Sequence, residues 1–403
     1  MSGAFDGLKV ADFSWAIAGP LVTRYLADHG AMVIRVESSG RPCLQRISAP
    51  YKDGIPGINR SGYFAFFNAN KYSIDLNLNN AKGMEVAKRL VAWADVVVEN
   101  FSPGRMEAWG LGYDDLKSIK PDIIMLRSSN QGQSGPHANY SSTGVPLIGL
   151  AGFPPFIGWP DRTPLPIPVA YTDMVSPRFA TAALIAALDY RRRTGKGQYI
   201  DISQFETGIQ FLTPAVLDYV VNGREGERRG NASLYAAPHG AYRCQGDDRW
   251  CAIAVFTDEE WKSFCKAISN PPWTENPKFS TLRDRKENED ELNRLVEEYT
   301  INFTAEEVMT AMQSAGVAAG VIEDSSDLLA DPQLKHRGYF LKLTHHEIGP
   351  MSSLSQSFRL SKTPAEAQMP APCLGEHTDY VRTEILGISD EEFVELLQAG
   401  AFN

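Results

Sequence analysis

The chain has 403 residues, of which 43% are hydrophobic and 22% are charged, a composition typical of a packed globular protein rather than a disordered one. There are 39 Lys and Arg against 49 Asp and Glu, so the net charge is -10. This balance argues against a nucleic-acid partner or an anionic membrane surface, because both require a basic field.

The sequence shows no membrane or secretion signal. No stretch reaches the roughly 20 apolar residues that a membrane-spanning helix needs. The first residues lack the basic region and apolar core of a signal peptide. The five cysteines are scattered and odd in number, so we expect reduced thiols and neither a disulfide framework nor a zinc site. We therefore expect a cytoplasmic protein.

The first two hundred residues alternate between short apolar runs and longer amphipathic runs. The apolar runs predict strands at 10–13, 31–36, 95–98, 122–126 and 199–202. The amphipathic runs predict helices at 21–28, 82–94 and 175–193. Apolar strands separated by helices are typical of parallel sheets covered by helices. The sequence therefore predicts an α/β fold with a Rossmann-like parallel sheet.

The composition changes near residue 222. Residues 222–231 are charged, rich in Gly and Arg, and poor in apolar side chains, which is typical of a linker or surface loop. Beyond this segment we expect a strand at 250–255 and helices starting at 261, at 286–299, at 304–315 and at 389–399. We predict a first domain over 1–224 and a smaller α+β domain over 225–325. Composition alone leaves 326–403 as either a third unit or a return to the first domain.

The common cofactor motifs are missing. Gly110 and Gly112 are followed by Asp115, where a dinucleotide fingerprint would need glycine, and no P-loop motif occurs. Nicotinamide and ATP chemistry are therefore disfavoured. The seven histidines include no pair at the spacing of helical metal ligands, so we expect no metal site.

Asp173 stands at the predicted start of a long Ala- and Leu-rich helix. A helix start has free N–H groups and a dipole that keep a carboxylate ionised. On spacing alone, a role for Asp173 as a helix N-cap is the better explanation. The wider pattern around it gives a second interpretation.

Eight motifs in one order resemble family III CoA-transferases, the family that includes formyl-CoA transferase and carnitine CoA-transferase. They are Ala18-Gly19-Pro20, Asn68–Ile74, Glu99–Gly104, Gly132–Pro136, Pro168-Val169 with Asp173, Arg191 with Thr194–Gln198, Asp331–Leu334, and Leu374–Thr378. The resemblance covers nearly the whole chain. It implies that 326–403 returns to a large CoA-binding domain and that two chains form an interlocked homodimer.

The resemblance also implies the site. Asp173 matches the family's nucleophilic aspartate, and Lys71 would offer a cation to the CoA phosphates. The implied CoA-binding residues are Ile17, Ala18, Asn68, Ala69, Asn70, Lys71, Asn100, Phe101, Ser102 and Arg105. No permanently bound cofactor and no metal are implied, because the CoA thioester is itself a substrate.

The activity implied by the resemblance is transfer of CoA from an acyl-CoA to a free carboxylic acid, through an aspartyl anhydride and an aspartyl-CoA thioester. Two alternatives stay open. A related α-methylacyl-CoA racemase would use a histidine opposite the aspartate, and His137 lies in a partial echo of that motif. A non-catalytic CoA-binding protein would keep the fold without the chemistry.

The chain departs from the family pattern at several basic positions. Ser38 stands where formyl-CoA transferase has an arginine, and the arginine expected near residue 108 is absent. Arg41, Arg46 and Arg105 are the candidate replacements. Residues 153–159, rich in Pro and aromatic side chains, predict either an acyl pocket or a packed loop.

Overall fold

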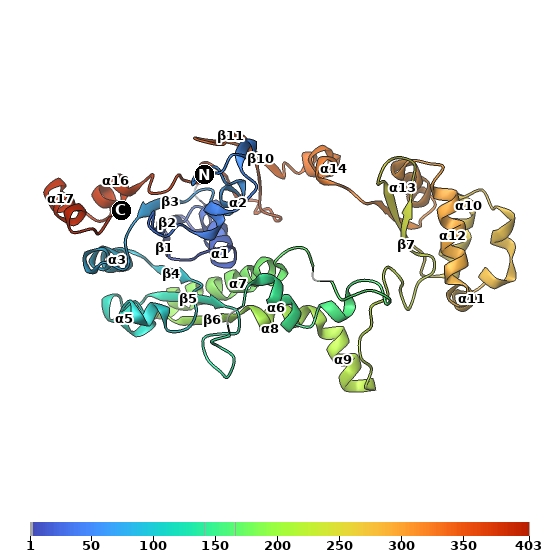
Figure 1. Ribbon diagram of the computed structural model, residues 1–403, viewed down its shortest axis with the longest axis horizontal. Helices are drawn as coiled ribbons and strands as arrows, with labels where there is room; N and C mark the ends of the chain where they lie inside the picture. The colour runs from blue at the N-terminus through green and yellow to red at the C-terminus, as the bar shows by residue number, and fades with distance from the viewer. Residues whose placement is uncertain (1–2, 141, 166, 403) are drawn as a thin grey trace. The chain divides into compact units, whose positions relative to one another are not determined.

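The structure, a computed structural model, describes residues 3–140, 142–165 and 167–402. It contains two compact units (Figure 1). The first comprises the described residues of 1–154, 166–225 and 333–403, and the second comprises 155–165 and 226–332. The segment 155–165 groups with the second unit, an assignment that the sequence pattern does not indicate.

The first unit is built on a six-stranded parallel sheet with strand order β3-β2-β1-β4-β5-β6. The strands are β1 (Lys9–Asp12), β2 (Met32–Glu37), β3 (Tyr72–Asp75), β4 (Val96–Glu99), β5 (Ile124–Ser129) and β6 (Tyr199–Ser203). β1 pairs in parallel with both β2 and β4. The expected Rossmann-like α/β fold is therefore confirmed.

Both faces of the sheet are buried along the central strands β1, β4 and β5, which explains why these strands are largely apolar, whereas the edge strand β6 is partly exposed. On one face Val10, Val33 and Val96 pack with residues of α1 (Ala18–Asp28) and α7 (Tyr171–Thr194). On the other face Ala11 and Ile34 pack with residues of α3 (Ala81–Trp93), α5 (Tyr113–Ile119) and α17 (Asp390–Gln398). Because successive side chains of a strand point to opposite faces, the sheet contributes to two separate hydrophobic cores.

The remaining helices of this unit are short. They are α2 (Gly62–Phe67), α3 (Ala81–Trp93), α4 (Arg105–Ala108), α5 (Tyr113–Ile119), α6 (Gly144–Leu150), α8 (Gln204–Ile209), α9 (Thr213–Asn222), α16 (Thr378–Tyr380) and α17 (Asp390–Gln398). α15 (Pro332–His336) leads into the antiparallel pair β10 (Phe340–His345) and β11 (Gly349–Leu354). α7 starts four residues before its expected beginning, at Tyr171.

The second unit has a three-stranded antiparallel sheet, ordered β7 (His239–Arg243), β8 (Trp250–Ala254), β9 (Ala318–Val321). Its helices are α10 (Asp258–Ala267), α11 (Leu282–Glu287), α12 (Glu289–Thr300), α13 (Ala305–Ser314) and α14 (Ser325–Ala330). The helix expected over 286–299 is wrong in its start. Asn288 leaves helical geometry (φ -119°, ψ 29°), so it ends α11 and precedes α12.

The C-terminal part of the chain lies against β3 (Figure 1). The Asn77 N–H donates to the carbonyl of Ala401 (2.8 Å), and the His377 N–H donates to the carbonyl of Ser73 (2.9 Å). Residues near both chain ends therefore complete one unit. Within the described residues, no helix is both long and apolar enough to cross a bilayer.

Candidate active site

The order of the strands places a crevice outside the carboxyl ends of β1 and β4, where the chain's connections leave the sheet in opposite directions. Ligands bind at such points in open α/β sheets. The segments that follow the two strands are joined here. The Trp15 N–H donates to Asn100 Oδ1 (2.6 Å), and Asn100 Nδ2 donates back to the Trp15 carbonyl (2.8 Å).

A cavity of about 250 Å³ opens beside this junction. Its aromatic walls include Phe13, Trp15, Phe101 and Trp109, and its polar lining includes Ser102, Arg41 and Arg105. The Arg41 guanidinium lies 5.3 Å from the centre of the Trp15 ring, and that of Arg105 lies 5.7 Å from Trp109. Aromatic faces and cations together suit a ligand with an adenine ring and phosphates.

The structure brings only some of the expected CoA-binding residues to this cavity. Phe101, Ser102 and Arg105 line it, and Asn100 holds Trp15. Ile17 and Ala18 are buried at the start of α1, where Ile17 packs on Phe67. Whether these residues bind CoA stays a prediction.

Lys71 does not fit its expected role. Its side chain is fully buried, and its three N–H groups have partners in Asp12 Oδ2 (3.1 Å), the Pro20 carbonyl (2.9 Å) and Asn68 Oδ1 (2.9 Å). The ammonium is therefore enclosed by protein, and it has no N–H left for a CoA phosphate.

Asn68, Ala69 and Asn70 are also buried. Asn70 is used to dock the C-terminal segment: its Nδ2 donates to the Glu366 carbonyl (2.8 Å), and its Oδ1 accepts from the Met369 N–H (2.9 Å). Asn68 Nδ2 donates to the Phe64 carbonyl (3.0 Å) and so ends α2. In this conformation the segment after α2 supports the fold and does not line the cavity.

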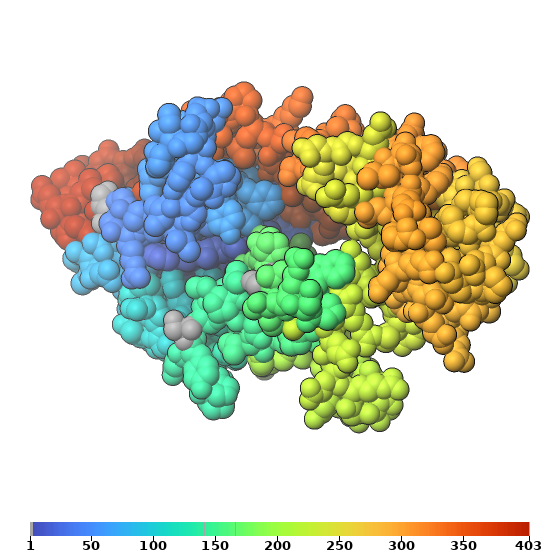
Figure 2. All heavy atoms as spheres, turned by 45° about the vertical axis from the view of Figure 1, so that its right-hand side comes forward, coloured from blue at the N-terminus to red at the C-terminus, as the bar shows by residue number. Residues whose placement is uncertain are grey.

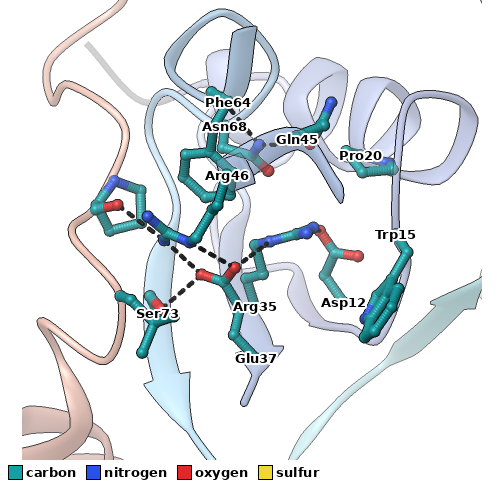
Figure 3. A network of polar contacts seen from close by, with 12 residues as sticks. Asp12, Trp15, Pro20, Arg35, Glu37, Gln45, Arg46, Phe64, Asn68 and Ser73 are labelled. Atoms are coloured by element: carbon teal, nitrogen blue, oxygen red, sulfur yellow. Dashed lines mark hydrogen bonds and ion pairs between the residues drawn. The ribbon is translucent and has the colours of Figure 1, made fainter. Parts of the chain in front are cut away.

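The candidate replacement arginines separate into two kinds. Arg46 is fully buried and forms a two-point pair with Glu37 (2.8 and 2.6 Å), while its guanidinium lies 3.5 Å from the Phe64 ring centre (Figure 3). Its Nη2 also donates to the Pro372 carbonyl (3.1 Å). Arg46 is thus unsuited to contact a phosphate, whereas Arg41 and Arg105 line the cavity.

Asp173 is the third residue of α7, and Ala170 occupies the N-cap position. The capping interpretation of Asp173 is therefore wrong. A Cβ added to Gly144 would come within 2.7 Å of Asp173 Oδ2, so only glycine at residue 144 leaves room for this carboxylate. Gln204, at the first position of α8, hydrogen bonds to Asp173.

Burial raises the pKa of Asp173 to about 6, against the hydrogen bond from Gln204, which lowers it. The expectation that the helix start keeps this carboxyl strongly ionised is thus outweighed by desolvation. Within the described residues, no ion pair reaches Asp173. A group with a pKa of about 6 is still about nine-tenths ionised at pH 7, so it stays available as a nucleophile.

Asp173 lies near the expected CoA-binding segment. Ala170, the N-cap of α7, and Met174, the residue after Asp173, pack in one apolar cluster with Ile17, Phe67 and Tyr63. The Asp173 charge also contributes, after burial, to a raised pKa of Tyr63. The start of α1 and the start of α7 are therefore neighbours.

The residues of this site that sequence reasoning missed include Trp15, Gln204 and Tyr63, together with Phe13 and Trp109 in the wall of the cavity. Gln204 had a usable signal, because it is a polar residue directly after a strand of a parallel sheet, where functional side chains gather. Trp15 also follows a strand. Tyr63 had no such signal, since only tertiary packing brings α2 to α7.

The remaining candidates from the sequence are His137 and the segment 153–159. His137 is exposed and contacts the Tyr140 ring (4.4 Å between centres). In the segment 153–159, Phe153 packs on Tyr171 at the start of α7 (5.3 Å), whereas Phe156 and Trp159 belong to the second unit. There they pack against Gly226 and Gly230, where a Cβ would collide with each ring, so this part is a packed loop.

The sequence and the fold are similar to those of known proteins. Residues 5–378 match the family model of CoA-transferase family III. The chain is 32% identical to succinyl-CoA–D-citramalate CoA-transferase of Chloroflexus aurantiacus, covering 98% of this chain and 96% of that one. It is 30% identical to human succinyl-CoA:glutarate CoA-transferase, covering 98% and 89%.

A solved structure shows the same fold. A CAIB/BAIF family protein from Brucella suis superposes with a TM-score of 0.87 at 31% identity, covering 95% of this chain and all (100%) of that one.

Proposed function

The chain belongs to CoA-transferase family III, and we propose that it moves CoA from an acyl-CoA thioester to a free carboxylic acid through covalent intermediates on Asp173. The observation that carries this proposal is the Asp173 carboxylate itself. It is largely buried, it has no cationic partner among the described residues, and it lies beside the apolar cluster of Ile17. A desolvated carboxylate that remains mostly ionised is a better nucleophile than one in water.

The reaction has two halves. An Asp173 oxygen attacks the thioester carbonyl and the C–S bond breaks. CoA departs as the thiolate, and the acyl group is now joined to Asp173 in a mixed anhydride. The thiolate then attacks the aspartyl carbonyl, which forms an aspartyl-CoA thioester and releases the donor acid. In the second half the acceptor carboxylate attacks the aspartyl-CoA thioester, which expels CoA thiolate and forms a second mixed anhydride. The thiolate then attacks the acceptor's acyl carbonyl in this anhydride. The products are the new acyl-CoA and free Asp173, so thioester energy is conserved.

We place the CoA nucleotide in the cavity of Trp15 and Phe101, with its phosphates near Arg41 and Arg105. The support is the lining of the cavity by two guanidinium groups and aromatic faces. The two arginines would then replace the family cations that the sequence lacks. Lys71 has no direct contact with CoA in this proposal.

For the substrates we propose succinyl-CoA as donor and a C4–C5 dicarboxylic acid as acceptor. The support is that two relatives of about this length are named for succinyl-CoA with D-citramalate and with glutarate. A panel of acyl-CoA donors, including succinyl-CoA, against dicarboxylic and aromatic acids checks this choice.

We also propose a homodimer. Its support is α9, where no residue is buried and Leu217, Tyr219, Val220 and Val221 are each more than half exposed. Figure 2 shows this helix, in yellow-green, standing clear of the neighbouring parts of its unit. A contiguous apolar surface of this kind is typical of an interface. Light scattering showing a stable monomer at low concentration would contradict it.

Covalent labelling tests the central proposal. The protein is incubated with succinyl-CoA, trapped with hydroxylamine or borohydride, digested and analysed by peptide mass spectrometry. We expect modification at Asp173 and none in Asp173→Asn, which keeps the size of the side chain. A racemase would give no adduct and would exchange the α-proton of an α-methylacyl-CoA with solvent. Binding without an adduct, transfer or exchange would favour a non-catalytic CoA-binding protein.

A further inference from the structure

Five charged side chains are buried together, beside the carboxyl ends of β1 and β2 and the amino end of β3. They are the carboxylates of Asp12 and Glu37 and the cations of Arg35, Arg46 and Lys71. Figure 3 labels Asp12, Arg35, Glu37 and Arg46 of this cluster. Burying charges is costly unless each is paired. The mechanism described above uses none of the five.

Asp12 is the centre of this cluster on the side of the CoA cavity. Its Oδ2 accepts from Lys71 Nζ (3.1 Å) and from Thr23 Oγ1 (2.7 Å). Its Oδ1 accepts from the backbone N–H of Ser14 (2.9 Å) and from the Ser14 hydroxyl. Asp12 therefore fixes the turn that follows β1.

That turn forms a wall of the cavity. It continues from Ser14 to Trp15, whose backbone is bonded at both ends to Asn100. Ala16 has a positive φ of 53°, and a Cβ added to Gly19 would lie 2.2 Å from the Ser14 Cβ. The turn is thus tightly seated on the start of α1. A shift of Asp12 would pass through Ser14 to Trp15.

Arg35 competes with Lys71 for Asp12. Its guanidinium is fully buried and lies between two carboxylates, 3.6 Å from Asp12 Oδ2 and 3.5 Å from Glu37 Oε1, and neither ion pair has the geometry of a hydrogen bond. With Lys71 in place, Asp12 is held on the side of Pro20 and Asn68. Without that cation, the nearest unsatisfied donors for the Asp12 carboxylate are those of Arg35.

We propose that Lys71 is a positioning residue for CoA binding, which acts through Asp12 and the Ser14–Trp15 turn on the wall of the cavity. This inference rests on the proposed function. It assigns to Lys71 an effect on CoA affinity without a contact to CoA. Such a role differs from general support of the fold, because it acts on the CoA-binding step and not on the acceptor acid.

The charges around Lys71 add a pH dependence. The groups that face the Lys71 ammonium are Asp12 of β1, Arg35 of β2, Arg24 and the Pro20 carbonyl of α1, and Asn68 at the end of α2. Burial lowers the pKa of the Lys71 ammonium to about 8, while the Asp12 charge opposes this. Loss of that proton above pH 8 weakens the hold on Asp12, so the KM for acyl-CoA should rise there.

The test compares Lys71→Met with Lys120→Met. Lys120 is a matched control, because it is a partly buried lysine of the same unit that bonds the Ala94 carbonyl and Asp95 (2.7 and 3.2 Å). These partners lie at the amino end of β4, whereas the cavity lies at the carboxyl ends of the strands. We expect Lys71→Met to raise the KM for acyl-CoA and the Kd for free CoA roughly tenfold, the usual loss when a charged hydrogen bond is broken. The kcat and the acceptor KM should stay within about twofold, and Lys120→Met should match the wild type in all four.

Two further measurements complete the test. The rise of the acyl-CoA KM above pH 8 should occur in the wild type and be absent in Lys71→Met. If Lys71→Met does not fold, the double variant Lys71→Met/Asp12→Asn removes both charges and should give the same loss of CoA affinity. Unchanged CoA affinity in a folded variant, or equal losses in the acyl-CoA and acceptor KM, would overturn the inference. A wild type that does not bind CoA would instead overturn the proposed function.

Discussion

Asp12 and Asp173 are carboxylates of the same unit, Asp12 fully buried and Asp173 partly buried, and their charged surroundings differ. Burial would raise the pKa of Asp12, but the charges of Lys71 and Arg35, with hydrogen bonds from Ser14 and Thr23, hold it below its usual value. Asp173 has the hydrogen bond of Gln204 and no such cation, so burial prevails and its pKa rises to about 6. The presence of a cation therefore distinguishes the two: Asp12, which has one, supports the structure, and Asp173, which has none within the described part of the chain, is available for chemistry.

The largest expected difference between the two is in turnover. Asp173→Asn should lower kcat for CoA transfer on the order of 10⁴-fold or more, because the amide cannot form the anhydride. Asp12→Asn should keep most of kcat and raise the KM for acyl-CoA. Steady-state kinetics with succinyl-CoA checks both. Near-normal transfer by Asp173→Asn would contradict the proposed role.

Stability should change in opposite directions. The native state binds the Asp173 proton more tightly than the unfolded chain, so its contribution to stability falls as pH rises from about 4 to about 6 and stays low above. Asp173→Asn removes this loss and should raise the free energy of unfolding at pH 7.5 by up to about 3 kcal/mol. Asp12→Asn leaves buried cations without their carboxylate and should cost about 3–5 kcal/mol.

Denaturant titrations at pH 7.5 and pH 4 measure these differences. The gain of Asp173→Asn should shrink at pH 4, where the wild-type carboxyl holds its proton in both states for much of the time. A destabilised Asp173→Asn at pH 7.5 would mean that its charge is compensated after all.

The two arginines of the cavity, Arg41 and Arg105, test where the CoA phosphates bind. Arg41→Ala and Arg105→Ala should each raise the KM for acyl-CoA roughly tenfold, as expected when a charge-assisted phosphate contact is lost. Dephospho-CoA thioesters then identify which arginine meets the 3′-phosphate. Arg192→Ala, an exposed arginine paired with Asp189, is the control and should change nothing. If neither cavity variant alters KM, the nucleotide lies elsewhere.

The smallest effect concerns the acidic limb of the pH profile. Protonation of Asp173 should reduce kcat as pH falls through about 6. Gln204→Leu removes the hydrogen bond that favours the charged form and should move this limb upward by roughly half a unit to one unit. Gln210→Leu, at an exposed position six residues later, should leave the profile unchanged. A limb that does not move would remove Gln204 from the site.

Much of the first unit could be predicted from the sequence, because its strands are apolar on both faces and its helices alternate with them. The runs at 95–98 and 199–202 agree with β4 and β6 to within one residue. The start of α7 was placed late, since Tyr171 and Asp173 do not belong to the apolar pattern that marks its centre. The break at Asn288 depends on backbone geometry that a continuous charged run does not reveal.

The site was less predictable than the fold. Asp173 could be singled out by its motif, but its lack of a cation is a property of packing. Lys71, Arg41 and Arg46 are three basic residues that the motif comparison offers equally as cations for a phosphate. Only tertiary pairing decides that Arg46 meets Glu37, that Lys71 meets Asp12, and that Arg41 lies over Trp15.

The docking of the C-terminal segment on β3 also bears on the order of events during synthesis. Asn70 is hydrogen bonded to Met369, and Asn77 to Ala401. The edge of the parallel sheet therefore cannot be completed until residue 401 has been synthesised. The second unit ends at residue 332 and is complete before those partners exist. Since domains generally fold as units during translation, we expect the second unit to reach its native state first and the first unit to close last.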